Sequence, residues 1–227
     1  MENIKYVLFD LDGTLTDSEE GITNSARYAL KKMNVEPKGD LRYFIGPPLY
    51  ETFKEHYDFS QEESDRAISF FREYFSTKGV FEHKLYDGIL NTLKTLKERG
   101  KTLVLATSKP EVFAVSILKQ YKIDGLFSFI CGATMDESRT EKTDVIKYAL
   151  KNIKKDFIKN NPYNIEETNL LDSCVMIGDR RHDIVGAKNC GLKSIGVTFG
   201  FGSLEELKAA EATEIASTPE EILSIIK

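Results

Sequence analysis

Residues 4–16 read Ile-Lys-Tyr-Val-Leu-Phe-Asp-Leu-Asp-Gly-Thr-Leu-Thr. A short apolar run ends abruptly in two carboxylates, Asp10 and Asp12, and a glycine and two threonines follow. The run is rich in strand-favouring residues and is closed by glycine, so it predicts a buried strand with a loop at its carboxyl end. Residues two apart in extended backbone point to the same face, and both carboxylates can therefore face one ligand.

Apolar and amphipathic segments alternate after residue 80. The apolar segments predict strands at 102–107, 127–131, 174–178 and 194–198. The amphipathic segments predict helices at 90–96, 143–153 and 184–190. Strands separated by helices predict the α/β class, with a Rossmann-like core in which a parallel sheet is flanked by helices.

Residues 17–80 carry helical patterns and no strand pattern. Three helices are predicted, the second around 49–57 and the third opened by the capping box Ser60-Gln61-Glu62-Glu63. We therefore predict two domains, an α/β core of residues 1–16 and 81–227 and an inserted all-α helical cap domain. The insertion leaves the sheet just behind the first strand end, where it is placed to cover a site.

The bulk composition is that of a soluble globular protein, with 41% hydrophobic and 30% charged residues among 227. A net charge of −5 argues against a nucleic-acid binder, which would usually carry a basic surface. No apolar run approaches the roughly 20 residues that span a bilayer, and no signal peptide precedes the first strand. Three cysteines without metal-ligand spacing predict reduced thiols in a cytoplasmic protein.

Polar motifs follow three of the predicted strands. Asp10, Thr107 and Asp179 fall at or just beyond strand ends. Ligands of parallel sheets bind outside the carboxyl ends of the strands, so we expect these residues to share one site. Asp183 lies four residues after Asp179, and the pair is predicted to share one face of a helix.

The motif Asp-x-Asp-Gly-Thr-x-Thr behind an apolar strand resembles the first motif of the haloacid dehalogenase superfamily, most of whose members are magnesium-dependent phosphatases. Three further segments resemble its phosphoglycolate-phosphatase-like branch, which has a helical (C1-type) cap. They are Gly46-Pro47-Pro48, Ala106-Thr107-Ser108-Lys109-Pro110 and Ile195-Gly196-Val197-Thr198-Phe199-Gly200-Phe201-Gly202-Ser203. The resemblance covers almost the whole chain and implies a phosphatase.

The resemblance implies a catalytic role for each motif residue. Hydrolysis of a phosphate monoester needs a nucleophile, an acid for the leaving oxygen and positive charge around the phosphoryl oxygens. Asp10 would attack and form an aspartyl-phosphate, while Asp12 would protonate the leaving group and then deprotonate water. Thr107 and the backbone N–H of Ser108 would bind a phosphoryl oxygen. Lys142 is the best-placed candidate for the lysine of the third motif.

A cation is needed because carboxylates that face an anionic phosphate repel it. Mg²⁺ fits, since it takes oxygen ligands in octahedral geometry and keeps waters and substrate oxygens in its shell. By the resemblance, the predicted ligands are Asp10, Asp12, Asp179 and Asp183. Whether Asp183 touches the ion directly stays open.

The sequence therefore predicts a magnesium-dependent phosphomonoester hydrolase that acts on a small phosphorylated metabolite. Phosphoglycolate, a nucleoside monophosphate (for a 5′-nucleotidase) and pyrophosphate are considered as substrates, in that order. Asp12 argues against dehalogenation, because halide leaves without protonation. A phosphonatase with a Schiff-base cap lysine, a phosphosugar mutase and a non-catalytic binding module are the alternatives.

Within residues 17–80, Arg42 and the Gly46 loop are the candidates for contact with the leaving group. No nucleic-acid or membrane partner is expected, and the chain is expected to be a monomer or a homodimer. The polar segment 154–172 resembles an insertion whose role the sequence leaves open. The substrate and the open or closed state of the cap are also left open.

Overall fold

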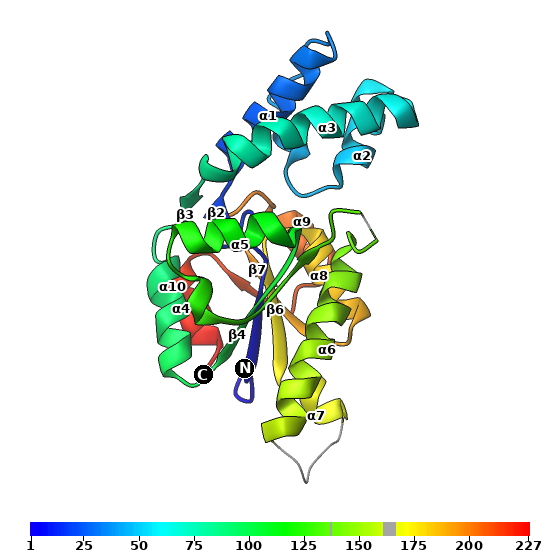
Figure 1. Cartoon of the computed structure of the whole chain (residues 1–227). Helices are drawn as coiled ribbons and strands as arrows, with labels where there is room; N and C mark the ends of the chain where they lie inside the picture. Colours follow the sequence, from blue (N-terminus) through cyan, green and yellow to red (C-terminus); the bar gives the residue numbers. More distant parts are fainter. Residues whose placement is uncertain (137, 161–166) are drawn as a thin grey trace. The chain divides into compact units, whose positions relative to one another are not determined.

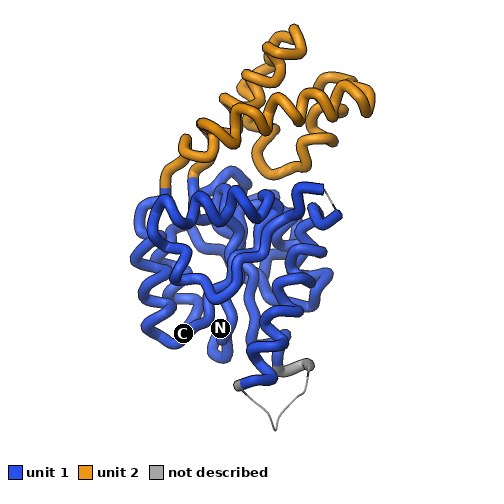
Figure 2. The backbone as a smooth tube through the Cα atoms, in the orientation of Figure 1, with its two compact units in different colours: residues 1–16, 85–227 blue, residues 17–84 orange. Residues whose placement is uncertain are grey.

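The computed structural model describes residues 1–136, 138–160 and 167–227 (Figure 1). The chain divides into two compact units, coloured separately in Figure 2. Unit 1 comprises Met1–Thr16 and Leu85–Lys227, and unit 2 comprises Asp17–Lys84. Two short strands, β2 (Thr16–Asp17) and β3 (Lys84–Leu85), contain the boundaries and pair as a two-stranded sheet.

Unit 1 is built on a six-stranded sheet in the order β5-β4-β1-β6-β7-β8. Its strands are β1 (Tyr6–Phe9), β4 (Thr102–Pro110), β5 (Phe127–Ala133), β6 (Cys174–Gly178), β7 (Lys193–Val197) and β8 (Glu214–Ala216). Every pairing in this sheet is parallel, which confirms the predicted α/β class. The order places β1 between β4 and β6, so the ends of the three motif-bearing strands are neighbours.

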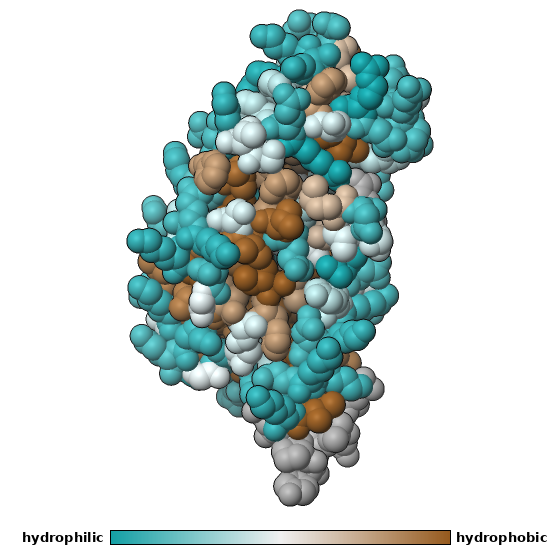
Figure 3. Space-filling view, viewed as in Figure 1, coloured by the Kyte–Doolittle hydropathy of each residue, from teal (hydrophilic) through white to brown (hydrophobic). Residues whose placement is uncertain are grey.

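Helices flank this sheet on both faces (Figure 1). They are α4 (Ile89–Glu98), α5 (Glu111–Gln120), α6 (Lys142–Asn160), α7 (Glu167–Asp172), α8 (Arg181–Asn189), α9 (Leu204–Ala209) and α10 (Pro219–Ile225), with the 3-10 turn η3 (Asp124–Leu126). α6 packs on β4, β5 and α8, while α4 packs against α10. In the face shown in Figure 3, apolar residues gather over the middle of unit 1 and hydrophilic residues surround them.

The core beneath α6 sets the direction in which the first strand points. Tyr6 and Leu8 of β1 are fully buried and pack in one cluster with Val145 and Ile146 of α6. Because side chains alternate along a strand, the next residue on the same side as Tyr6 and Leu8 is Asp10. The apolar core thus delivers the first carboxylate toward the start of α6.

Two predicted helix boundaries differ from the structure, and one strand was not predicted. α6 runs to Asn160 instead of ending at residue 153, and α8 begins at Arg181 instead of residue 184. The unpredicted strand is β8, which follows the strand predicted at 194–198 and pairs with β7 (Ile195 opposite Glu214). β8 has three residues, one of them an exposed glutamate, and so carries no apolar run.

Unit 2 is helical apart from the short strand segments at its two boundaries. It contains α1 (Glu19–Lys32), the 3-10 turn η1 (Arg42–Phe44), α2 (Leu49–Tyr57), α3 (Gln61–Thr77) and the 3-10 turn η2 (Gly79–Phe81). The capping box at Ser60 is confirmed, because Ser60 Oγ accepts from Glu63 N and the Glu63 carboxylate accepts from Ser60 N. α1 and α2 both pack on α3.

The segment 154–172 is helical at both ends, where α6 reaches Asn160 and α7 begins at Glu167. Residues 161–166 of this predicted insertion lie outside the described residues. Among the described helices, none combines the length and the apolar character needed to cross a bilayer.

Candidate active site

The ends of β1 and β6 lie side by side, next to the middle of β4, in the sheet of unit 1. Phe9, the last residue of β1, lies opposite Leu105 of β4 and Ile177 of β6. Asp10 directly follows, and its backbone N–H donates to the Ile177 carbonyl at 2.9 Å. This register brings the ends of β1 and β6 together, and Asp10 and Asp179 meet there in one acidic cluster. The prediction that Thr107 lies at or just beyond a strand end is wrong, because β4 continues to Pro110.

Lys142 joins two of the carboxylates at this edge. Its side chain is 5% exposed, and its Nζ lies 2.8 Å from Asp10 Oδ1 and 2.8 Å from Asp183 Oδ1. The same ammonium donates to the Ala106 carbonyl at 3.2 Å. Lys142 reaches this position because it is the first residue of α6, which packs over β4.

The charge states of Lys142 and Asp10 depend on each other, and both groups are buried. Burial alone would lower the pKa of Lys142, but the charges of Asp10 and Asp183 hold it above its ordinary value. Burial raises the pKa of Asp10 to about 6, although Lys142 acts in the opposite direction. Asp10 is therefore largely ionised at neutral pH and protonated in mild acid.

Asp10, Asp179 and Asp183 form one acidic cluster, in which an oxygen from each lies within 4.8 Å of the others. Asp179 is fully buried, accepts from Phe201 N at 2.8 Å and faces Thr14 Oγ1 at 3.4 Å. Burial, and then the charges of Asp183 and Asp10, raise the pKa of Asp179 well above its usual range. A cluster of this kind is unfavourable without a cation.

The local geometry of the second acidic pair differs from the prediction. Asp179 precedes α8, so it does not share a helical face with Asp183. Asp183 lies in the first turn of α8, and its Oδ2 accepts from Arg180 N at 3.1 Å. The two carboxylates meet because Asp183 folds back toward the strand end, where Gly178 leaves no Cβ in its way.

Asp12 lies outside this cluster and is paired with a second buried lysine. Lys109 Nζ is 2.6 Å from Asp12 Oδ2, and the two side chains are 6% and 16% exposed. Lys109 belongs to β4 and follows Thr107 by two residues. No role was predicted for Lys109 from the sequence, although the period of two along a strand places it on the same side as Thr107.

The site fits a divalent cation by its donors and by its charge. Asp10 Oδ1, Asp12 Oδ1 and Asp183 Oδ1 are buried, and within the part of the chain that the structure describes they make no hydrogen bond of good geometry. Four carboxylates (Asp10, Asp12, Asp179 and Asp183) and two ammonium groups (Lys109 and Lys142) give a formal charge of −4 + 2 = −2. Oxygen donors with a surplus of two negative charges suit Mg²⁺.

Comparison with known proteins identifies the family. Residues 7–197 match the model of a family described as haloacid dehalogenase-like hydrolase. The chain belongs to the haloacid dehalogenase-like hydrolase family. This match confirms the resemblance seen in the sequence, and the chain is an enzyme of the phosphatase type.

Relatives of this hydrolase span most of its length. A 5′-nucleotidase from Pseudomonas aeruginosa is 41% identical over 91% of this chain and 88% of its own. Tyrosine-protein kinase PtkA from Mycobacterium tuberculosis is 36% identical over 97% of this chain and 72% of its own. A phosphoglycolate phosphatase from Vibrio vulnificus is 26% identical over 99% and 97%. The crystal structure of a predicted phosphatase from Clostridium acetobutylicum shares 45% identity and a TM-score of 0.87, covering 98% of this chain and 97% of that one.

Glycines hold the acidic cluster of this haloacid dehalogenase-like hydrolase in place. Gly13 has φ +78°, and a Cβ there would clash with the Asp179 carboxylate. A Cβ at Gly200 would lie 2.5 Å from Asp179 Cβ and would also meet the Gly13 carbonyl. Gly200 and Gly202 therefore pack against Asp179, a role that the sequence pattern did not predict.

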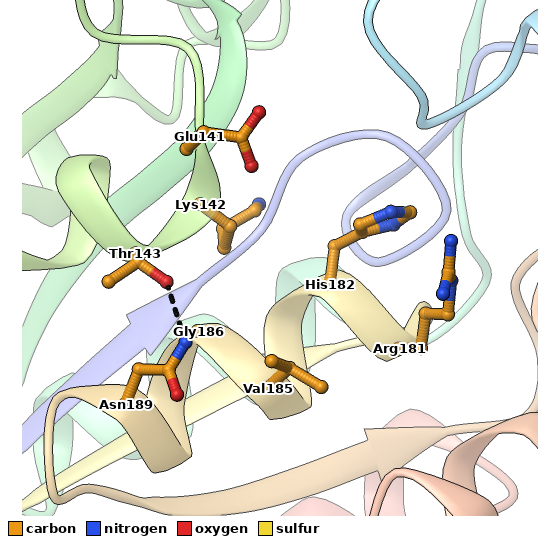
Figure 4. A pocket seen from close by; sticks show the side chains of 8 residues that line it. All are labelled: Glu141, Lys142, Thr143, Arg181, His182, Val185, Gly186 and Asn189. Carbon is orange, nitrogen blue, oxygen red and sulfur yellow. Dashed lines mark hydrogen bonds between the residues drawn. The ribbon is translucent and has the colours of Figure 1, made fainter.

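A pocket of about 200 Å³ lies between the start of α6 and one side of α8, along the length of α8 (Figure 4). It is lined by Glu141, Lys142, Thr143, Arg181, His182, Val185, Gly186 and Asn189. Asn189 Nδ2 donates to Thr143 Oγ1 at 3.2 Å across one end. Burial, and then the charges of Arg181 and Arg180, lower the pKa of His182. Because Lys142 lines the pocket and also contacts Asp10, the pocket adjoins the acidic cluster.

The two predicted substrate contacts of the helical segment, Arg42 and Gly46, belong to unit 2. Arg42 is exposed, and its Nε lies 2.9 Å from Glu19 Oε1. Gly46 has φ +104°, in the turn before α2. Ser108, the remaining predicted phosphate contact, follows Thr107 on β4 and is partly exposed.

Proposed function

We propose that this enzyme is a Mg²⁺-dependent phosphomonoesterase that passes the phosphoryl group of a small metabolite to Asp10 and then to water. One observation carries the proposal. Asp10 lies in a buried cluster between a lysine and two further aspartates, and Asp12 follows two residues later. This arrangement supplies the nucleophile, the proton carrier and the positive charge that phosphoryl transfer requires.

In the first step, an Asp10 carboxylate oxygen forms a bond to phosphorus while the bond from phosphorus to the leaving oxygen breaks. Asp12, which enters this step protonated once the substrate is bound, gives its proton to that oxygen, and an alcohol leaves. The pKa of Asp10, about 6, leaves its carboxylate ionised and nucleophilic at neutral pH. The Thr107 hydroxyl and the Ser108 N–H donate to phosphoryl oxygens, and Lys142 supplies charge beside Asp10.

In the second step, Asp12 takes a proton from water as the water oxygen bonds to phosphorus. The bond between Asp10 and phosphorus breaks, and inorganic phosphate is released. One residue thus moves a proton in both directions, while Asp10 returns to its starting state. Lys142 then regains the ion pair with Asp10 that the structure shows at 2.8 Å.

Asp10, Asp179 and Asp183 are the residues that would hold Mg²⁺, because their carboxylates cluster within reach of one ion. When bound, the ion would offset the negative charge of phosphate beside these carboxylates. The Asp12 carboxylate, paired with Lys109, is kept in this proposal for proton transfer. Asp183 also contacts Lys142, which orients its carboxylate.

Nucleoside 5′-monophosphates are the first substrate class that we propose. The relative named 5′-nucleotidase is 41% identical over 91% of the chain, whereas the phosphoglycolate phosphatase is 26% identical. 2-Phosphoglycolate is the second candidate, supported by the motifs at 106–110 and 195–203 as well as by that relative. Pyrophosphate follows.

A panel of phosphorylated metabolites, compared by kcat/KM with Mg²⁺ and with excess chelator, tests the proposal. We expect hydrolysis of nucleoside monophosphates that vanishes with chelator, returns with Mg²⁺ and is abolished by Asp10→Asn. Asp144→Asn is the matched control, because it removes a 53% exposed carboxylate of the same unit. Full activity in Asp10→Asn or in excess chelator, or no turnover of any phosphate ester by the wild type, would overturn it.

A further inference from the structure

The Lys109–Asp12 pair is buried, and no motif of the sequence analysis accounts for it. Lys109 Nζ lies 2.6 Å from Asp12 Oδ2, and the lysine side chain is 6% exposed. Burying an ammonium group is costly even when it is paired, and apolar residues often replace such pairs without loss of stability. Stability alone therefore does not account for a lysine at this position.

Both partners of the pair are anchored by the backbone. Lys109 lies on β4, and its N–H donates to Thr107 Oγ1 at 3.2 Å. Asp12 lies in a tight turn, in which the next residue's N–H donates to the Thr16 carbonyl at 2.7 Å. A rigid strand thus holds a cation against a carboxylate on a rigid turn, which is a suitable way to fix a side chain in one orientation.

The two buried lysines contact different carboxylates. Lys142 contacts Asp10 and Asp183, which belong to the acidic cluster. Lys109 contacts Asp12, whose carboxylate lies outside that cluster. The pairing therefore separates the carboxylate that moves protons from the carboxylates that would hold the cation.

We propose that Lys109 is a positioning residue that holds the Asp12 carboxylate by Oδ2 and leaves Oδ1 to exchange the proton with the leaving group and with water. Oδ1 is buried, and no described residue is its hydrogen-bond partner. A general acid must lie within hydrogen-bond reach of the atom it protonates, so fixing Oδ2 fixes the path of the proton. The inference rests on the proposed function, because it assigns a residue of the same site.

Leaving-group dependence and a double-mutant cycle test this inference. Lys109→Met should lower kcat for phenyl phosphate about 10- to 100-fold, within the range typical of acid–base assistance. The loss should be smaller for 4-nitrophenyl phosphate, whose leaving group needs little protonation, and KM should change little for either substrate. In an Asp12→Ala background, Lys109→Met should add no further loss, because Lys109 acts through Asp12.

Two further variants keep the test decisive. Lys109→Arg preserves the charge, and should fold and recover part of the loss with phenyl phosphate. Lys101→Met is the control, because its Nζ binds the Ile4 and Lys227 carbonyls before β4 begins, at the opposite end of that strand from Lys109. If Lys109→Met does not fold, an increased dependence of Lys109→Arg on the leaving group carries the same information.

The outcomes separate this inference from the function on which it rests. Wild-type rates in Lys109→Met, a raised KM with unchanged leaving-group dependence, or losses that multiply in the Asp12→Ala background each overturn the positioning role. In all three cases, turnover by the wild type and its loss in Asp10→Asn leave the proposed phosphatase mechanism intact. A wild-type chain that hydrolyses no phosphate ester overturns both.

Discussion

Mg²⁺ should raise the thermal stability of this chain, and the increase should grow with pH. The physical reason is the surplus of negative charge in the site, where four carboxylates face two lysines. Without a cation, Asp10 resists ionisation, and burial raises its pKa from 3.8 to about 6. Burial and the neighbouring carboxylates raise the pKa of Asp179 as well.

The direction of this pH dependence follows from proton linkage. Between pH 3.8 and about 6, the folded chain keeps a proton on Asp10 that the unfolded chain has released. The free energy of unfolding of the metal-free chain therefore falls as pH rises through this window. Mg²⁺ must displace the same proton, so its affinity should weaken by about tenfold for each pH unit below 6.

The size of the stabilisation by Mg²⁺ follows from mass action. At pH 7.5 and a Mg²⁺ concentration 100 times its Kd, binding adds about 2.7 kcal/mol to the free energy of unfolding. At pH 5, a tenfold weaker Kd leaves about 1.4 kcal/mol at the same concentration. For a chain of this size, Tm should rise by roughly 5–11 °C at pH 7.5 and by roughly 3–6 °C at pH 5.

Thermal melts at both pH values, with MgCl₂ compared against NaCl of equal ionic strength plus chelator, measure this difference. Asp179→Asn should remove most of the response and should raise the Tm of the metal-free chain, because it relieves repulsion among buried carboxylates. Asp144→Asn, at an exposed carboxylate, should leave the response unchanged. Equal Mg²⁺ shifts at the two pH values, or no shift at pH 7.5, would refute the reasoning.

Three further perturbations have defined outcomes. Lys142→Met should lower the free energy of unfolding, measured with denaturant at pH 7.5, by about 3–5 kcal/mol, because it leaves buried carboxylates unpaired. Lys147→Met, at an exposed lysine, should lower it by less than about 0.5 kcal/mol. Asp12→Ala should slow hydrolysis of alkyl phosphates far more than that of 4-nitrophenyl phosphate; equal losses would contradict its role as acid. Gly200→Ala should push on Asp179 and lower the apparent Mg²⁺ affinity, measured by titration of activity; an unchanged titration would contradict the packing role of that glycine.

The sequence was most informative where a single physical rule determines where a residue lies in the fold. The apolar run before Asp10 predicts a strand, and parallel strands share the edge at which they end, so the meeting of Asp10 and Asp179 could be predicted. Lys142 could be ranked first among the lysines because it begins a helix near the same edge. No long-range contact was needed for these predictions.

The remaining features depend on contacts that the sequence pattern does not encode. Lys109 in a Thr-Ser-Lys-Pro segment has the pattern of a solvated loop, and only the extension of β4 to Pro110 shows that the lysine is buried. Spacing by four predicted a shared helical face for Asp179 and Asp183, but α8 begins two residues after Asp179. β8 was missed because its three residues carry too little apolar surface.

In unit 1, the apolar residues that stabilise the fold and the carboxylates that destabilise it lie in different places. The bodies of β1, β4 and β6 are buried and apolar, and they place the unfavourable carboxylates only where the strands end. Lys142 and Lys109, which belong to separate elements, offset two of the four negative charges. Two negative charges of the site therefore stay without a cationic side chain to balance them. Complete neutralisation by protein groups would give a more stable fold with no remaining attraction for a cation. The retained charge is therefore the feature that would couple folding stability to the binding of Mg²⁺, and the stability gained by Asp179→Asn would measure the stability that the fold loses by keeping this charge.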